Sequence, residues 1–169
     1  EIGRVRDLLK EGVTEVRRFM FDLRPATLQD YGLAQTVQKY VEDYGRFFGR
    51  PATCSVTGTM PPLTPEQDLT VFRIIQEALT NVLRHAHART VQLDLRYEPS
   101  QVVIRIRDDG TAASPGQAGS NGQDGHGISG MRERALALSG QFTAGPHPDG
   151  GVRARVERLT AQLLRTHEL

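Results

Sequence analysis

The sequence is poor in cysteine, in long apolar runs and in net charge. Cys54 is the only cysteine among 169 residues, so an internal disulfide and a metal site built from several cysteines are both excluded. No apolar run approaches the roughly 20 residues that a membrane-spanning helix needs, and no signal peptide is visible. The formal net charge of +1 gives no reason to expect a nucleic-acid partner.

Length and composition indicate one globular domain with an appendage. Hydrophobic residues make up 38% of the chain and charged residues 24%, and both fractions are ordinary for a globular protein. Because the chain begins with Glu1 rather than with methionine, we expect it to be a piece of a longer protein.

Residues 1–24 carry the pattern of a long amphipathic helix. It ends at Arg24-Pro25, since a residue before proline avoids the helical conformation. The apolar stripe on such a helix needs a partner helix, either an upstream hairpin mate or a second copy of the chain. The positions with a seven-residue period are Ile2, Val5, Leu9, Val16, Phe19 and Leu23.

Apolar periodicity predicts helices and strands through the rest of the chain. Residues 90–97 and 102–107 alternate so cleanly between apolar and polar that their sheet should be covered on one face only. Residues 160–169 are expected to form a tail. The predicted elements are a helix over 33–48, a strand over 52–58, a helix that starts after Thr64 and carries 77–88, strands over 90–97 and 102–107, a helix over 128–138, and strands over 141–144 and 152–159.

Thr64 can cap the helix that follows it, and Pro65 suits the first helical position. This helix carries the densest chemistry. Glu77, Asn81 and the pair Arg84/His85 follow one another by one turn, so they should share a face. An amide oxygen can bind Mg²⁺, a cation can neutralise phosphate, and a carboxylate can orient a metal-bound water or act as a base. Taken alone, the same pattern suits a solvated helix face equally well.

A second candidate site comes directly after a predicted strand, at Asp108-Asp109-Gly110. A carboxylate at a strand end can accept a hydrogen bond from the exocyclic amine of adenine, and it would reject the carbonyl of guanine. Gly110 has no Cβ and would let the backbone approach a flat base. By itself, this tripeptide is also a common turn.

A third candidate is the glycine-rich run Gly125-His126-Gly127, which leads directly into a helix. Free backbone amides and the positive end of the helix dipole suit a chain of phosphates. Residues 111–124, which precede it, are small and polar and predict a mobile loop.

In this order, the three motifs resemble the Bergerat-type ATPase fold of the GHKL superfamily. More narrowly, they are similar to the ATP-binding catalytic domain of sensor histidine kinases that work with NarL-type response regulators. Residues 77–86 match the asparagine box, residues 108–110 the first glycine box and residues 125–134 the second. Upstream, residues 22–33 most resemble the link found in the DegS-type branch. The resemblance runs from about Val13 to about Leu159.

The resemblance implies an α+β fold, a two-layer α/β sandwich. Its mixed, mostly antiparallel sheet would be covered on one face by helices, after a coiled-coil-like N-terminal helix. Residues 1–24 would be the last helix of the dimerisation hairpin, 25–32 a linker, 33–159 the ATP-binding catalytic domain and 160–169 the tail. The implied setting is cytoplasmic, with any membrane anchor upstream, and the implied assembly is a homodimer through the N-terminal helix.

The resemblance also implies an activity and its residues. The γ-phosphoryl group of Mg-ATP would pass to a histidine outside this fragment, for relay to a NarL-type response regulator. Asn81 would bind Mg²⁺, Glu77 would assist at the metal and the γ-phosphate, Asp108 would bind adenine, Gly110 would shape its pocket, and residues 111–124 would be the ATP lid. The other residues expected around the cofactor are Arg84, His85, Gly125, His126, Gly127 and Ile128.

Two departures from the family pattern keep alternatives open. Ala112 replaces the usual second glycine of the first glycine box. No phosphoacceptor is found, because residues 1–24 contain no histidine and His167-Glu168 lies in the tail. Anti-sigma-factor serine kinases share the asparagine box, but they lack the link at residues 22–25 and the long heptad helix. A degenerate, non-catalytic dimerisation or scaffold domain is the other alternative.

Overall fold

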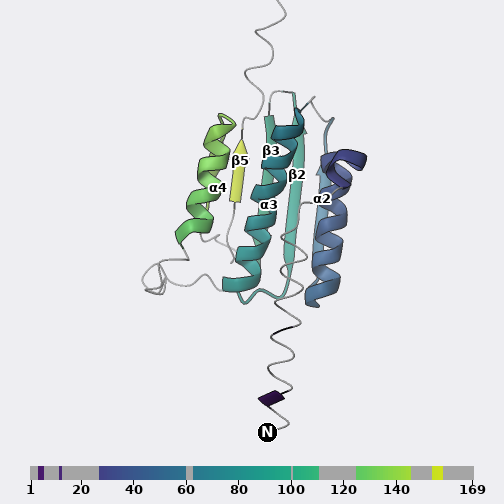
Figure 1. Cartoon of the computed structure of the whole chain (residues 1–169), viewed down its shortest axis with the longest axis vertical. Helices are drawn as coiled ribbons and strands as arrows, with labels where there is room; N and C mark the ends of the chain where they lie inside the picture. The colour runs from purple at the N-terminus through teal and green to yellow at the C-terminus, as the bar shows by residue number, and fades with distance from the viewer. Residues whose placement is uncertain are drawn as a thin grey trace, which may run out of the picture.

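Three helices lie on one face of a five-stranded sheet (Figure 1). The chain is described from a computed structural model. Along the sequence come α2 (Thr27–Phe48), β1 (Ala52–Thr57), α3 (Pro65–His85), β2 (Val91–Glu98), β3 (Gln101–Asp108), α4 (Gly125–Ala137), β4 (Gln141–Thr143) and β5 (Ala154–Glu157). The structure describes residues 4, 5, 12, 27–59, 63–99, 101–110, 125–145 and 154–157.

The strands have the order β1-β2-β3-β5-β4, and one pair among them is parallel. β1 pairs with β2 in parallel, since α3 carries the chain back across the sheet between them. The other neighbouring pairs are antiparallel. The predicted α+β fold with a mixed, mostly antiparallel sheet is therefore confirmed. The N-terminal helix predicted over 1–24, the loop over 111–124 and the tail over 160–169 lie outside the described residues, apart from residues 4, 5 and 12.

The core fills the space between the sheet and the helices. On β2 every second residue is buried, and on β3 the buried row on the helix side ends in a polar residue, Asp108. Tyr40 of α2 meets Phe72 of α3 edge to face, with ring centroids 5.1 Å apart. The largest fully buried side chains are Tyr44, Phe72, Leu33, Ile74, Ile75, Leu79, Leu93, Leu95, Ile104, Ile106, Val37 and Val41.

The start of α3 is fixed by a capping box. The Thr64 hydroxyl oxygen accepts a hydrogen bond from the Gln67 backbone N–H at 3.2 Å, and the Gln67 side chain accepts one from the Thr64 backbone N–H at 2.9 Å. Pro65 occupies the first turn, as predicted. The other end differs from the prediction. α3 ends at His85 rather than at residue 88, because Ala86 caps it and His87 takes a left-handed backbone with φ 47°.

The predicted connector over residues 25–32 is largely helical. α2 begins at Thr27 and bends at Gly32, whose φ of 73° and ψ of 174° belong to a region that essentially only glycine adopts. Leu28, before the bend, is 6% exposed and is part of the hydrophobic core. The short helical piece therefore packs on the body of the domain.

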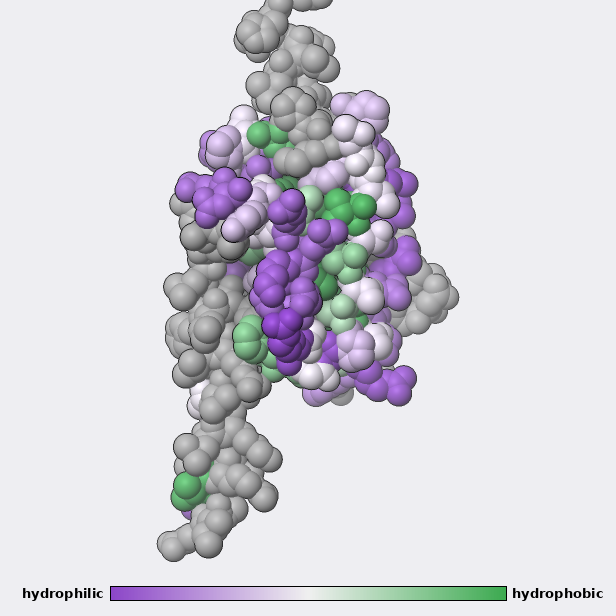
Figure 2. Space-filling model, turned by 90° about the vertical axis from the view of Figure 1, so that its right-hand side faces the viewer, coloured by the Kyte–Doolittle hydropathy of each residue, from purple (hydrophilic) through white to green (hydrophobic). Residues whose placement is uncertain are grey.

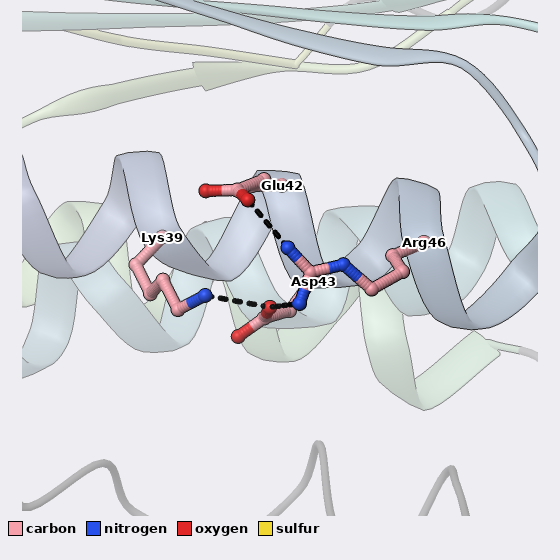
Figure 3. Close-up of polar contacts among 4 residues, drawn as sticks. All are labelled: Lys39, Glu42, Asp43 and Arg46. Atoms are coloured by element: carbon pink, nitrogen blue, oxygen red, sulfur yellow. Dashed lines mark hydrogen bonds and ion pairs between the residues drawn. The ribbon is translucent and has the colours of Figure 1, made fainter.

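The outer face of α2 is polar and carries a small ion-pair network (Figure 3). Lys39 lies 3.0 Å from Asp43, and Arg46 lies 2.6 Å from Glu42 and 3.5 Å from Asp43. Figure 2 shows hydrophilic side chains gathered in a band on this side of the molecule. Exposed pairs of this kind contribute only about 0.3–0.5 kcal/mol each, so this face adds little to stability. In the part of the chain that the structure describes, no helix is both long and apolar enough to cross a bilayer.

Candidate functional site

The first turn of α4 lies directly on α3. A Cβ built on Gly127 would be 2.5 Å from Oε1 of Glu77, 3.1 Å from Nδ2 of Asn81 and 3.2 Å from Oδ1 of Asn81. A side chain at residue 127 would therefore make the Glu77 carboxylate move and would press on the Asn81 amide, whereas glycine lets both lie against the first turn of α4. The structure therefore brings together Glu77, Asn81 and Gly127, which the sequence placed in two separate motifs.

The end of β3 lies against the end of α3. A Cβ on Gly110 would be 1.9 Å from the carbonyl oxygen of Ala86, and that oxygen belongs to the backbone and cannot swing away. Asp108 is 6% exposed, and its Oδ1 accepts a hydrogen bond from the Gly110 N–H at 2.9 Å. The carboxylate is thus held at the helix-facing edge of the sheet.

These two contacts place the second glycine motif and the end of β3 against the C-terminal half of α3. Asn81 meets α4 and Ala86 meets the end of β3, five residues further along the chain. That separation corresponds to about 7.5 Å along a helix axis. The end of β3 and the first turn of α4 thus meet α3 at neighbouring turns.

A buried tyrosine lies in the electrostatic field of Asp108. Burial raises the pKa of Tyr44 to about 12, with the charge of Arg50 acting in the opposite direction and that of Asp108 adding to the rise. Tyr44 comes from α2 and is 1% exposed. The pattern that predicted a helix over 33–48 gives no sign of this relation, because it depends on how α2 packs on the sheet.

Asp109 makes a contact beside the site that the sequence motifs did not reveal. Its Oδ1 accepts hydrogen bonds from the backbone N–H groups of Arg89 and Thr90, both at 2.7 Å. Hydrogen bonding by the Thr90 backbone is the main cause that holds the pKa of Asp109 below its ordinary value. The tandem Asp-Asp before Gly110 was the only sequence signal, and it does not indicate which backbone the second carboxylate meets.

A family comparison decides what this arrangement is. Residues 66–162, more than half of the chain, match the family described as "Histidine kinase-, DNA gyrase B-, and HSP90-like ATPase". The chain belongs to this ATPase family. The match includes all three motifs, from the asparagine-bearing α3 to the glycine-led α4.

Relatives of this ATPase domain include named histidine-protein kinases, among them DegS, whose branch the motifs resembled. The chain is 30% identical over 151 residues to the "Signal transduction histidine-protein kinase/phosphatase DegS" of Brevibacillus brevis, an alignment that spans 89% of this chain and 38% of the relative. It is 34% identical over 145 residues to the UhpB histidine-protein kinase/phosphatase of Salmonella typhimurium, spanning 83% and 28%. The sensor protein VraS of Staphylococcus haemolyticus is 28% identical, spanning 93% and 44%.

Solved structures share the fold of this ATPase domain. The blue-light activated histidine kinase EL346 of Erythrobacter litoralis superposes with a TM-score of 0.60 at 18% identity, covering 78% of this chain and 43% of that one. The ATP binding domain of PrrB from Mycobacterium tuberculosis superposes with a TM-score of 0.53 at 18% identity, covering 75% and 93%. The chain spans less than half the length of the curated relatives named above.

The remaining candidate residues lie at the end of α3 and at the start of α4. Arg84 is exposed at the end of α3, and Ile128 is 44% exposed on α4. Gly125 and His126 form the start of α4, where the first backbone N–H groups have no partner within the helix. The side chains of His85 and His126 lie outside what the structure describes, as does Ala112.

The donor set fits a nucleotide-bound magnesium ion better than a metal held by protein alone. Among the described residues there is no group of three or more histidine, cysteine, aspartate or glutamate side chains that could hold a metal. Asn81 offers one amide oxygen beside Glu77, and both side chains lie against Gly127. Mg²⁺ is commonly bound by one or two protein ligands together with substrate phosphates and water.

Proposed function

We propose that this chain binds Mg-ATP between α3, the end of β3 and α4, as the catalytic domain of a two-component sensor histidine kinase. The γ-phosphoryl group would pass to a histidine outside this chain, and from there to a NarL-type response regulator. The single observation that carries the proposal is the close contact of Gly127 with Glu77 and Asn81. This contact supports the proposal, because it sets the first turn of α4, which would bind the phosphates, beside Asn81, which would bind the metal.

The adenine end of the site would be formed by Asp108. Its Oδ1 is already held by the Gly110 N–H, and the carboxylate would accept a hydrogen bond from the exocyclic amine of the base. Gly110 lets the end of β3 approach the Ala86 carbonyl and its own N–H reach Asp108, and it would thereby shape the pocket of the base. Burial of the carboxylate makes a mismatched carbonyl group costly, since two acceptors would face each other.

The phosphate end would be formed by α3 and α4. Asn81 would hold Mg²⁺ and Glu77 would orient a water on it or assist at the γ-phosphate. The backbone of Gly125, His126, Gly127 and Ile128 starts α4 and would present N–H groups to the phosphates. Arg84 and His85, at the end of α3, would add positive charge along the same chain.

Phosphoryl transfer asks the protein mainly for positioning and for charge neutralisation. The acceptor nitrogen forms a bond to the γ-phosphorus while the bond from that phosphorus to the bridging oxygen of ADP breaks. Mg²⁺, when bound, neutralises the charge that develops on the leaving diphosphate. The residues of this chain would hold the base, the metal and the phosphates in line.

The proposed function assigns the segments of the chain as the sequence predicted them. Residues 1–24 would supply the last helix of a dimerisation hairpin, 25–32 the link and 33–159 the catalytic domain, so that two copies pair through the N-terminal helix. The catalytic domain would work in the cytoplasm, where ATP and the response regulator are found. The named relatives DegS and UhpB, which are described as kinase/phosphatases, support this assignment.

Calorimetric titration with ATP and Mg²⁺ tests the nucleotide site. We expect binding by the parent chain and at least a tenfold weaker affinity in Asn81→Ala, about 1.4 kcal/mol. Gln92→Ala, which changes an exposed residue on the opposite face of β2, should leave the affinity unchanged. With radiolabelled ATP, the chain alone should form no phosphohistidine.

Each alternative has its own outcome. No heat with ATP or ADP in the parent, with Asn81→Ala behaving in the same way, would favour a non-catalytic scaffold. Transfer of phosphate to a serine of an added sigma-antagonist protein would favour the serine-kinase alternative. Phosphohistidine formed by this chain alone would contradict an acceptor located outside it.

A further inference from the structure

We propose that Asp109 is a positioning residue for the base site: its carboxylate latches the end of β3 onto the connection between α3 and β2 and so holds Asp108 in place. The inference rests on the nucleotide-binding function proposed above. Asp109 lies between Asp108 and Gly110, and only those two residues were given a role above.

The latch consists of two short hydrogen bonds to one oxygen. The N–H groups of Arg89 and Thr90 both reach Oδ1 of Asp109 at 2.7 Å. The Asp109 N–H points back to the carbonyl oxygen of Thr90 at 3.4 Å. Residues 89 and 90 therefore hold Asp109 through both its side chain and its backbone.

The guanidinium group of Arg89 is a minor part of this contact. Its Nε lies 3.7 Å from Oδ2 of Asp109, and the Arg89 side chain is 91% exposed. An exposed ion pair at that distance adds little. The two backbone amides are fixed by the chain itself, so they are the part of the contact that can define a position.

The latch affects the site through the residues on either side of Asp109. Asp108 precedes it and is buried with one oxygen on the Gly110 N–H. Gly110 follows it and fits against the Ala86 carbonyl. Residues 108–110 thus meet the connection after α3 at two points, Ala86 and Arg89-Thr90, and losing the second point would remove one of the contacts that fix the end of β3, where Asp108 lies.

Two substitutions separate the parts played by the acceptor and by the charge. Asp109→Asn keeps a carbonyl oxygen that can accept from both amides, but without the negative charge. Asp109→Ala removes the acceptor altogether. We expect the amides of Arg89 and Thr90 to exchange with solvent faster in Asp109→Ala than in the parent, with Asp109→Asn in between. This measurement needs no nucleotide.

A comparison of two nucleotides distinguishes positioning from a general structural role. ATP offers an exocyclic amine to Asp108, whereas inosine triphosphate offers a carbonyl and cannot use that acceptor. If Asp109 positions Asp108, Asp109→Ala should weaken ATP binding about tenfold, the loss of one charge-assisted hydrogen bond. Binding of inosine triphosphate should change by less than about twofold. Asp109→Asn should fall between parent and alanine variant.

The matched control is Asp43→Ala, which removes an aspartate from the ion-pair network on α2 (Figure 3). It should change neither nucleotide affinity nor exchange at Arg89 and Thr90. Equal loss for both nucleotides, or no loss for either, would overturn the positioning role. If Asp109→Ala does not fold, the asparagine variant decides by the same ratio of affinities. A parent chain that binds no ATP would instead contradict the proposed function, while the exchange measurement would still test the latch.

Discussion

Gly127 on α4 and Asn81 on α3 lie so close that a methyl group at residue 127 would press on both polar atoms of the Asn81 side chain. A Cβ at residue 127 would be 3.1 Å from the Asn81 amide nitrogen and 3.2 Å from its oxygen. These two residues are 46 positions apart in the sequence (127 minus 81), so the contact is made by the packing of α4 on α3. It is the point at which the asparagine motif and the second glycine motif become one site.

Gly127→Ala should weaken Mg-ATP binding by at least about tenfold. The added methyl group would lie 2.5 Å from Oε1 of Glu77 and would displace Glu77, Asn81 or the start of α4. Gly130→Ala is the control on the same helix, because its Cβ meets only the end of the flexible Arg134 side chain at 3.1 Å. That variant should keep its affinity and gain up to about 1 kcal/mol of stability from the better helix former. Equal affinities in both variants would contradict this prediction.

Gly110→Ala should destabilise the fold itself. Its Cβ would overlap the Ala86 carbonyl, which is backbone, so β3 or the end of α3 must shift. We expect a loss of about 1–3 kcal/mol in the free energy of unfolding, as for other overpacked sites. Urea denaturation would measure it. Gly145→Ala, where nothing lies within 4 Å of the added methyl group, should be nearly neutral.

Thr64→Ala should remove about 1 kcal/mol of stability through the lost cap of α3. The hydroxyl group accepts the Gln67 N–H at 3.2 Å, and alanine leaves that donor without its capping partner. Thr70→Ala, on the same helix, replaces a helix-interior threonine with a better helix former and should be neutral or slightly stabilising. Because Thr64 caps the opposite end of α3 from Asn81, nucleotide affinity in the folded variant should equal that of the parent.

The protein should lose stability in strong alkali through two buried phenols. Burial is the main cause that raises the pKa of Tyr44 and of Tyr97 to about 12, from an ordinary value of 10.0. A group that holds its proton more tightly when folded stabilises the fold fully below its unfolded pKa. That contribution is lost as the pH rises from about 10 through 12. Denaturation series between pH 8 and 12 should show the fall, and Tyr97→Phe should flatten it.

Local features of the sequence predicted the elements and the composition of the site. The three- and four-residue spacing on α3 placed Glu77 and Asn81 on one face, since helix geometry alone determines that relation. Thr64 was predicted as a cap from its position before Pro65, and the capping box confirms it. The alternation of β3 placed Asp108 at its end, where the structure has it.

Contacts between distant segments could not be predicted in this way. The seat of Gly110 on Ala86 and the bonds from Asp109 to Arg89 and Thr90 depend on how β3 lies beside the end of α3. The prediction that the helix carries residues 77–88 was wrong at its end for a related reason. His87 has no sequence signal for a positive φ, and its conformation follows from the turn that leads the chain into β2.

The bend at Gly32 has a mechanical consequence. The helical pieces on either side of it, one with Leu28 and the other with Leu33, are both anchored in the hydrophobic core. A change in the direction of the chain before Thr27 would thus reach the hydrophobic core first through Leu28, and only then the bend at Gly32.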